Sequence, residues 1–238
     1  MKFPLVAISI LFVCIVYGQN QKLGTWNIVN AKINIDKKWS FFVETQARSQ
    51  EFFNYFYYYE LKAGIGFAIN KNYSVLIGTG RYATYSNTGN FEKPFVNEEF
   101  RIWQQVTMNQ YLARLKFEHR YRTEQRWLTN GGFRNRFRYR INSYFPLNSK
   151  DFRPRTFYLT AFDEIFLTNR APYFERNRVF AGVGYKFSDQ LILQPGFIHQ
   201  FDYRSDNTKS GKSFFQVTLF IETKSFLTDH HKLPASDD

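Results

Sequence analysis

The chain has 238 residues, a formal net charge of +12 and an aromatic content of 20%, with 28 Phe, 16 Tyr and 4 Trp but a single Cys. Its 44% of apolar residues is too high for an intrinsically disordered chain, and one cysteine cannot form an intrachain disulfide, so both of these classes are excluded. Beyond residue 18 no apolar run approaches the roughly 18 residues of a spanning helix, which excludes a helical membrane protein.

The first 18 residues have the pattern of a cleaved signal peptide. Residues 3–16 form an apolar stretch that is too short to span a bilayer, and Val16 and Gly18 supply small residues before the cleavage site. We expect cleavage before Gln19, which removes Cys14 and leaves a mature chain without cysteine. An exported, cysteine-free chain fits the envelope of a Gram-negative bacterium better than a disulfide-rich secreted module.

From Gln19 onward, apolar and polar side chains alternate with a period of two, which is typical of half-buried β-strands. In residues 111–124 one face is mostly aromatic and aliphatic, while the other carries arginine, lysine and glutamate. The predicted strands are 24–35, 39–49, 56–68, 73–84, 97–107, 111–124, 133–145, 156–167, 177–187, 191–202 and 213–223. Because bacterial single-chain barrels have even strand numbers, we expect ten to twelve strands, with one strand missed or the first segment outside the ladder.

The connections between these strands alternate in length. Short turns are expected at 36–38, 70–72, 108–110 and 188–189, longer polar loops at 49–55, 86–96, 125–132, 168–175 and 203–212, and an intermediate connection at 145–155. Short periplasmic turns, longer outer loops and strands of about ten residues are typical of a transmembrane β-barrel. We therefore predict an all-β fold with a single antiparallel transmembrane barrel over residues 19–226 and a polar C-terminal tail at 227–238.

A soluble β-sandwich or a lumenal lipid-carrier barrel shows the same alternation, because its apolar face packs inward and its charged face meets water. Three features favour the membrane barrel. The aromatic content exceeds what one small core needs, the chain carries an export signal, and the difference between turns and loops repeats along the chain. In a membrane barrel, apolar side chains face lipid and ionic side chains meet in the lumen.

The inward faces of the central strands predict a lumen filled with charge, since small barrels fill their interior with side chains. A two-residue turn at Asn109–Gln110 would place Glu99 opposite Arg120 and Arg101 opposite Glu118. Arginine suits such a site because its fork binds carboxylates through two hydrogen bonds and stays charged when partly desolvated. The predicted lumen charge network is Glu99, Arg101, Glu118, Arg120, Arg122, Glu124, Arg136, Arg138, Arg140, Glu164 and Arg178. This network is either structural or the lining of an anion-selective pore or ligand site.

Five runs on successive strands carry a family resemblance. They lie at residues 98–105, 117–126, 136–140, 163–166 and 177–185. In this order they resemble the signature of an uncharacterised Gram-negative outer-membrane β-barrel family, catalogued as a domain of unknown function. The resemblance extends over nearly the whole mature chain. It implies a single barrel in the outer membrane and implies no activity.

The C-terminus departs from the usual pattern of outer-membrane barrels. Many of these barrels end on an aromatic residue that the assembly machinery reads, whereas here Phe226 is followed by a polar tail containing His230 and His231. The assembly signal would then be the internal strand at 214–226.

No pattern of catalytic or metal-binding residues stands out. His119 and His199 are predicted to face lipid or the interfacial aromatic girdle, and no serine stands two positions from either, so the Ser–His pair of a lipid hydrolase is not found. The adjacent His230 and His231 are too few for a metal site, and Gly182 to Gly184 lack the following helix of a phosphate loop. We expect no enzyme, no cofactor and no metal.

The function predicted from the sequence is an envelope structural protein or a narrow channel with an Arg/Glu-filled lumen. An anion-selective solute pore or transporter is the first alternative, and a barrel lipid hydrolase is the second. The expected partners are outer-membrane lipid and lipopolysaccharide, the barrel assembly machinery and an anionic small solute. Nucleic acid is not expected, although arginines alternate with aromatic residues, because the chain is exported.

Overall fold

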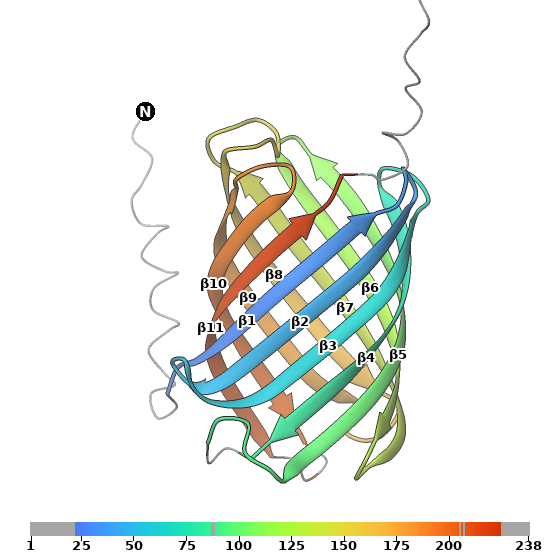
Figure 1. Cartoon of the computed structure of the whole chain (residues 1–238), viewed down its shortest axis with the longest axis vertical. Coiled ribbons are helices and arrows are strands. Elements are labelled where there is room, and N and C mark those ends of the chain that lie inside the picture. Colours follow the sequence, from blue (N-terminus) through green and yellow to red (C-terminus); the bar gives the residue numbers. More distant parts are fainter. Residues whose placement is uncertain (1–21, 87–88, 205, 207, 225–238) are drawn as a thin grey trace, which may run out of the picture.

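The computed structural model describes residues 22–86, 89–204, 206 and 208–224, which form one closed β-barrel (Figure 1). Its strands are β1 (Gly24–Asn34), β2 (Trp39–Glu51), β3 (Asn54–Ala68), β4 (Tyr73–Tyr85), β5 (Phe95–Leu112), β6 (Leu115–Leu128), β7 (Gly132–Pro146), β8 (Thr156–Thr168), β9 (Phe174–Lys186), β10 (Leu191–Tyr203) and β11 (Lys209–Glu222). The all-β barrel fold predicted from the sequence is confirmed. The described residues contain no helix with the length and hydropathy needed to cross a membrane. The predicted signal peptide and the tail at 227–238 lie outside the described residues.

The barrel closes through one parallel strand pair, which allows an odd number of strands to form a complete ring. All sequential neighbours are antiparallel, but β1 pairs with β11 in parallel from Gly24 opposite Phe214 to Lys32 opposite Glu222. The eleven strands of the described chain agree with the predicted ten to twelve, while the parallel closure differs from the expected antiparallel pairing and permits the odd number. The first strand is a full member of the ladder, since it also pairs with β2. As a result, β1 begins at one end of the barrel and β11 finishes at the other.

The two ends are named here by β1: the Gly24 end, where it begins, and the Asn34 end, where it finishes (the upper end in Figure 1). The connections at the Asn34 end are 35–38, 69–72, 113–114, 147–155 and 187–190, and those at the Gly24 end are 52–53, 86–94, 129–131, 169–173 and 204–208. Each end has one long connection and several short ones. The predicted difference between short turns and long loops is absent, because the strands extend into segments that were predicted as loops.

The turn between β5 and β6 lies further along the chain than predicted. Asparagine and glutamine at 109–110 favoured a turn there, but β5 continues to Leu112 and the chain reverses at 113–114. Ala113 adopts the left-handed conformation, with φ of 53°, which the tight reversal requires. The alternation of polar and apolar residues breaks at 109–112, where two polar residues are followed by two apolar ones, and this break gave a false signal for a turn within a strand that continues.

This displaced turn changes the predicted register but not the predicted faces. Arg101 lies opposite Arg126 rather than Glu118, and on the next ladder Arg136 lies opposite Glu124. The β5–β6 register differs from the predicted one by eight residues, which is an even number. Side chains alternate between the two faces, so an even shift keeps every inward residue inward.

Apolar side chains cover the outside of the barrel, and polar side chains fill most of its interior. On the outside, Ile77 is 63% exposed, Phe197 60% and Leu61 56%, whereas Arg101 is only 6% exposed and Glu60 4%. In β8 the burial of successive residues alternates almost perfectly along the strand. This distribution is the opposite of that in a soluble protein, which buries its apolar side chains.

One apolar cluster interrupts the polar interior on the side of β8 to β1. It consists of Trp26, Phe162, Phe180, Ile198 and Phe214. The Phe162 and Phe180 rings stack at a centroid distance of 5.0 Å. Glycine makes room for this cluster: a Cβ atom on Gly196 would lie 2.5 Å from Cζ of Phe180. The cluster therefore narrows the lumen from one side and leaves the charged residues to fill the other.

Candidate functional site

The eleven residues of the predicted lumen charge network lie together inside the barrel. They are inward residues of β5 to β9, and ten of them line one cavity of about 510 Å³. The remaining one, Glu124, is fully buried and bonded to its neighbours. Strand alternation alone places them on this face, while the pairing between strands decides which charges meet.

Glu124 is the first centre of the network. Its Oε2 accepts hydrogen bonds from Arg136 Nε at 2.9 Å and Nη2 at 2.5 Å, and its Oε1 accepts one from Arg138 Nη1 at 2.6 Å. Arg101 Nη1 lies 3.6 Å from the same carboxylate. The register explains this contact set, because Arg136 is directly opposite Glu124 and Arg138 is its diagonal neighbour.

Glu164 on β8 is the second centre. Its Oε1 accepts hydrogen bonds from Arg138 Nε at 3.0 Å, from Arg138 Nη2 at 2.8 Å and from Arg120 Nη2 at 2.5 Å. Arg138 therefore bridges two buried carboxylates, Glu124 and Glu164. Charge-assisted hydrogen bonds of this kind are among the stronger polar contacts in proteins. Together they connect β6, β7 and β8 across the lumen.

The network extends to the Gly24 end through residues that the sequence-based prediction did not include. Glu99 accepts hydrogen bonds from Arg101 Nε at 2.8 Å and from Arg126 Nη2 at 2.9 Å. Arg126 and Arg136 both reach Glu175, with N–O distances of 3.2 and 3.3 Å. Both missed residues lie in segments that were predicted as loops, Arg126 in 125–132 and Glu175 in 168–175. Arg126 has the same parity as the predicted members of its strand, so extending the alternation by two residues would have found it.

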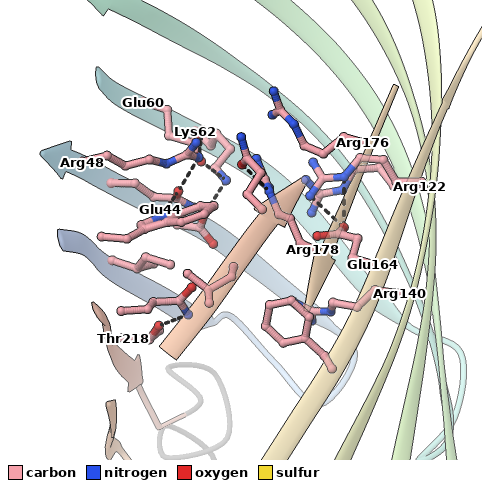
Figure 2. Close-up of a pocket in the computed structure, with 18 of the residues that line it drawn as sticks. Glu44, Arg48, Glu60, Lys62, Arg122, Arg140, Glu164, Arg176, Arg178 and Thr218 are labelled. Carbon is pink, nitrogen blue, oxygen red and sulfur yellow. Dashed lines mark hydrogen bonds and ion pairs between the residues drawn. The ribbon is translucent and has the colours of Figure 1, made fainter. Parts of the chain in front are cut away.

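A second ionic cluster on β2 and β3 was also missed. Lys62 Nζ lies 2.6 Å from Glu60 and forms a second ion pair with Glu44, and Arg48 Nη2 lies 3.7 Å from Glu60. Figure 2 shows these four side chains grouped apart from Glu164 and its neighbours. Glu44 and Arg48 stand on the polar face of a predicted strand, so the missing information was the pairing of Glu44 with Lys62.

Positive charge exceeds negative charge around the cavity. Its lining includes twelve Arg and Lys side chains but seven carboxylates, and Glu124 behind the lining adds an eighth. The excess is concentrated in a few arginines. Arg122 hydrogen-bonds the amide of Gln105 and lies 3.8 Å from its nearest carboxylate, and Arg178 Nε donates to Gln200. The ionisable side chains of the lumen therefore carry a net positive charge.

The outer face carries a Ser–His pair that sequence reasoning missed. His199 Nδ1 lies 2.8 Å from Ser213 Oγ, because the two residues are direct partners in the β10–β11 ladder. His119 Nδ1 similarly lies 2.9 Å from the hydroxyl of Tyr139. The search for a serine two positions from either histidine could not find a partner on a neighbouring strand. Among the described residues no carboxylate hydrogen-bonds His199.

The described part of the chain contains no group of three His, Cys, Asp or Glu residues that could hold a metal ion. His230 and His231 lie outside it. Gly182 and Gly184 are strand residues of β9, and a Cβ on Gly182 would lie 2.7 Å from Cζ of Phe180. Their role is close packing against aromatic rings.

Comparison with known proteins identifies a family but no activity. A family model described as "Protein of unknown function (DUF2490)" matches residues 23–211, which is nearly all of the barrel. No curated protein and no solved structure gives a match.

Proposed function

The chain belongs to the DUF2490 family of proteins of unknown function, and from this premise we propose that it is an outer-membrane β-barrel of a Gram-negative bacterium. The observation that carries the proposal is the apolar exterior around a charged interior. A contiguous exposed apolar surface makes a soluble protein associate. Lipid acyl chains would cover the same surface at no such penalty, and the ionic side chains would remain out of contact with lipid.

The dimensions of the barrel support this proposal. Strands of 13 residues, such as β2 and β8, are about 43 Å long at ~3.3 Å per residue, and they rise about 33 Å at a tilt of ~40°. The hydrocarbon core of a bilayer is about 30 Å thick. Outer-membrane lipid and lipopolysaccharide would then surround the barrel, after export by the signal peptide and insertion by the assembly machinery.

Within that membrane the barrel acts as an envelope structural protein or a narrow channel. Ion pairs link non-adjacent strands, such as Arg126 on β6 and Glu175 on β9, and the apolar cluster around Phe180 narrows the lumen further. Barrels with a wide aqueous channel have 16 to 18 strands, whereas small barrels fill their interior with side chains. A wide, non-selective pore is therefore the role that this interior supports least.

Gel mobility and cell fractionation test the membrane proposal directly. The folded protein is expected to run as a compact species in SDS until boiled, because the closed ladder resists the detergent, and to fractionate with the outer membrane. A chain that runs identically before and after boiling and is recovered in the soluble fraction would refute the proposal.

A second candidate function, an anion-selective pore or transporter, is favoured by the excess of arginine and lysine around the cavity. Single-channel recording in planar bilayers tests it. Measurable conductance should prefer chloride over potassium, and Arg120→Ala should reduce that preference because it removes one lumen cation. If bilayers that contain correctly folded protein show no conductance, the pore candidate is excluded and the structural role remains.

A third candidate, a barrel lipid hydrolase, is favoured only by the contact between His199 and Ser213. A serine nucleophile needs a base that a third group orients. Release of fatty acid from phospholipid by refolded protein, lost in Ser213→Ala, would support hydrolysis. Equal background release by both proteins would eliminate it.

A further inference from the structure

Two arginine side chains in the lumen stack against the same tryptophan ring. The guanidinium carbon of Arg48 lies 3.5 Å from the centroid of Trp26, and that of Arg178 lies 4.7 Å from it. The two carbons are therefore no more than 8.2 Å apart, the sum of these distances. Trp26 is itself held in place, because its Nε1 donates a hydrogen bond to Gln46 at 2.7 Å.

In the part of the chain that the structure describes, neither of these two guanidinium groups has an unshared carboxylate partner: Arg178 has none, and Arg48 shares one with Lys62. Arg178 donates one hydrogen bond, from Nε to Gln200 at 2.9 Å, and among the described residues no carboxylate lies within 4.0 Å of it. Arg48 is 3.7 Å from Glu60, which Lys62 already holds at 2.6 Å, and the buried Nε of Arg48 has no hydrogen-bond partner among the described residues.

Burial makes this arrangement unusual. Arg48 is 5% exposed and Arg178 7% exposed. Buried charges are normally paired, because an uncompensated charge removed from water is strongly unfavourable. Figure 2 shows Arg178 reaching into the space between the cluster of Glu44, Arg48 and Lys62 and the opposite wall of the lumen.

The space beside the two arginines is reached from the Gly24 end. Tyr57, Asp202 and Arg204 line both the lumen cavity and a second pocket of about 440 Å³, whose other residues include Lys22 and Lys212. Lys22 is at the start of the described chain, and Lys212 lies near the start of β11. Lys22 pairs with Glu51 at 2.7 Å, and the pocket lining carries three cations and two carboxylates, Glu51 and Asp202, so this entrance has a net charge of +1. A net positive charge at an entrance favours anions.

We propose that a small solute bearing a carboxylate or phosphate group binds between Arg48 and Arg178, against Trp26. The proposal deepens the anion-pore candidate and rests on the proposed barrel function. The site requires both guanidinium groups to face the cavity on the same side of the ring, closer together than the 8.2 Å limit, at which the ring itself would lie between them. An oxyanion whose central atom is roughly 4 Å from each guanidinium carbon then contacts both. The planar forks of arginine favour such an oxyanion over a spherical halide.

Titration of the refolded full-length protein in detergent tests the proposal. Inorganic phosphate and succinate are added separately at constant ionic strength, with chloride as the balancing anion, and the tryptophan fluorescence and the Tm are recorded. We expect saturable binding of at least one of the two oxyanions with a rise in Tm. The anion that binds more tightly identifies the source as phosphate or carboxylate.

Variants locate the site. Arg178→Gln and Arg48→Gln should each raise the Kd at least tenfold. Arg178→Lys, which keeps the charge and protects the fold, should raise the Kd less. Trp26→Phe should remove the fluorescence change but keep the Tm shift. Arg153→Gln, which removes one exposed charge from the 147–155 connection, is the matched control and should bind like the original protein.

The inference and the proposed function fail in different ways. If the protein is compact and heat-modifiable on gels but neither anion binds, or if Arg178→Gln leaves the Kd unchanged, the inference is wrong and the barrel function stands. If the protein is not heat-modifiable and is recovered in the soluble fraction, the membrane function is wrong, whether or not phosphate binds.

Discussion

Glu124 has a fully buried carboxylate with four arginines within 4.0 Å of it, more than Glu164 or Glu99 has. The four are Arg101, Arg122, Arg136 and Arg138. Glu124→Gln preserves the shape of the side chain but removes the negative charge. Arg136 and Arg138 then keep only one carboxylate each, Glu175 and Glu164, and the buried positive charge is less well compensated, so we expect the free energy of unfolding to fall by about 3–5 kcal/mol. Urea unfolding of the refolded protein in detergent measures this change.

The matched control for that variant is Glu98→Gln. Glu98 pairs with Arg81 on the outer face, where their side chains are 33% and 56% exposed. Partly exposed pairs contribute about 0–1 kcal/mol, so this variant should lose little stability. Equal losses in the two variants would contradict the structural role assigned to the buried carboxylate.

A charge exchange tests the observed register at the level of single side chains. Glu118 bonds Arg140 at 2.9 Å, whereas Arg120 bonds Glu164. Glu118→Lys should lower the yield of compact folded protein in detergent, because it places two cations together. Adding Arg140→Glu should partly restore the yield by exchanging the pair, and adding Arg120→Glu should not. Rescue by Arg101→Glu would instead support the register predicted from the sequence, in which Arg101 lies opposite Glu118.

At the scale of strands, the sequence predicts which face each residue occupies much better than it predicts strand pairing. The period-two pattern placed all eleven predicted charges inside the barrel, because alternation depends only on local spacing. Register depends on where a hairpin turns, and the polar pair at 109–110 was a false signal within a continuing strand. The pairing of Glu44 with Lys62 and the parallel contact of β1 with β11 are both long-range features that no local pattern encodes.

The parallel closure can be tested with a pair of cysteines. Ile28 lies opposite Thr218 in the β1–β11 ladder. The double variant Ile28→Cys and Thr218→Cys, made in the Cys14→Ala background, should form a disulfide on mild oxidation, because paired residues of adjacent strands meet the distance requirement. A shift in the mobility of the unfolded protein on a non-reducing gel detects it. Ile28→Cys with Val217→Cys is the control, since Val217 points to the opposite face and should not cross-link.

For the molecule as a whole, the long connections at 86–94 and 147–155 lie at opposite ends of the barrel. If the barrel spans the outer membrane, an epitope inserted into one connection should be cleaved by protease added to intact cells, and an epitope in the other should be protected until the cells are lysed. Both variants must show heat-modifiable mobility to count. Cleavage of both epitopes in intact cells would contradict a spanning orientation.

The contact between β1 and β11 also determines when the barrel can be completed. Gly24 and Phe214 are adjacent in space but belong to the first and the last strand of the barrel. Every other strand can pair with the segment made just before it, while this seam must wait until almost the whole polypeptide has emerged. Pairing across so long a loop is slow, and until it occurs two open edges stay available to neighbouring chains. We therefore expect the β1–β11 pairing to form last, after the ten sequential hairpins.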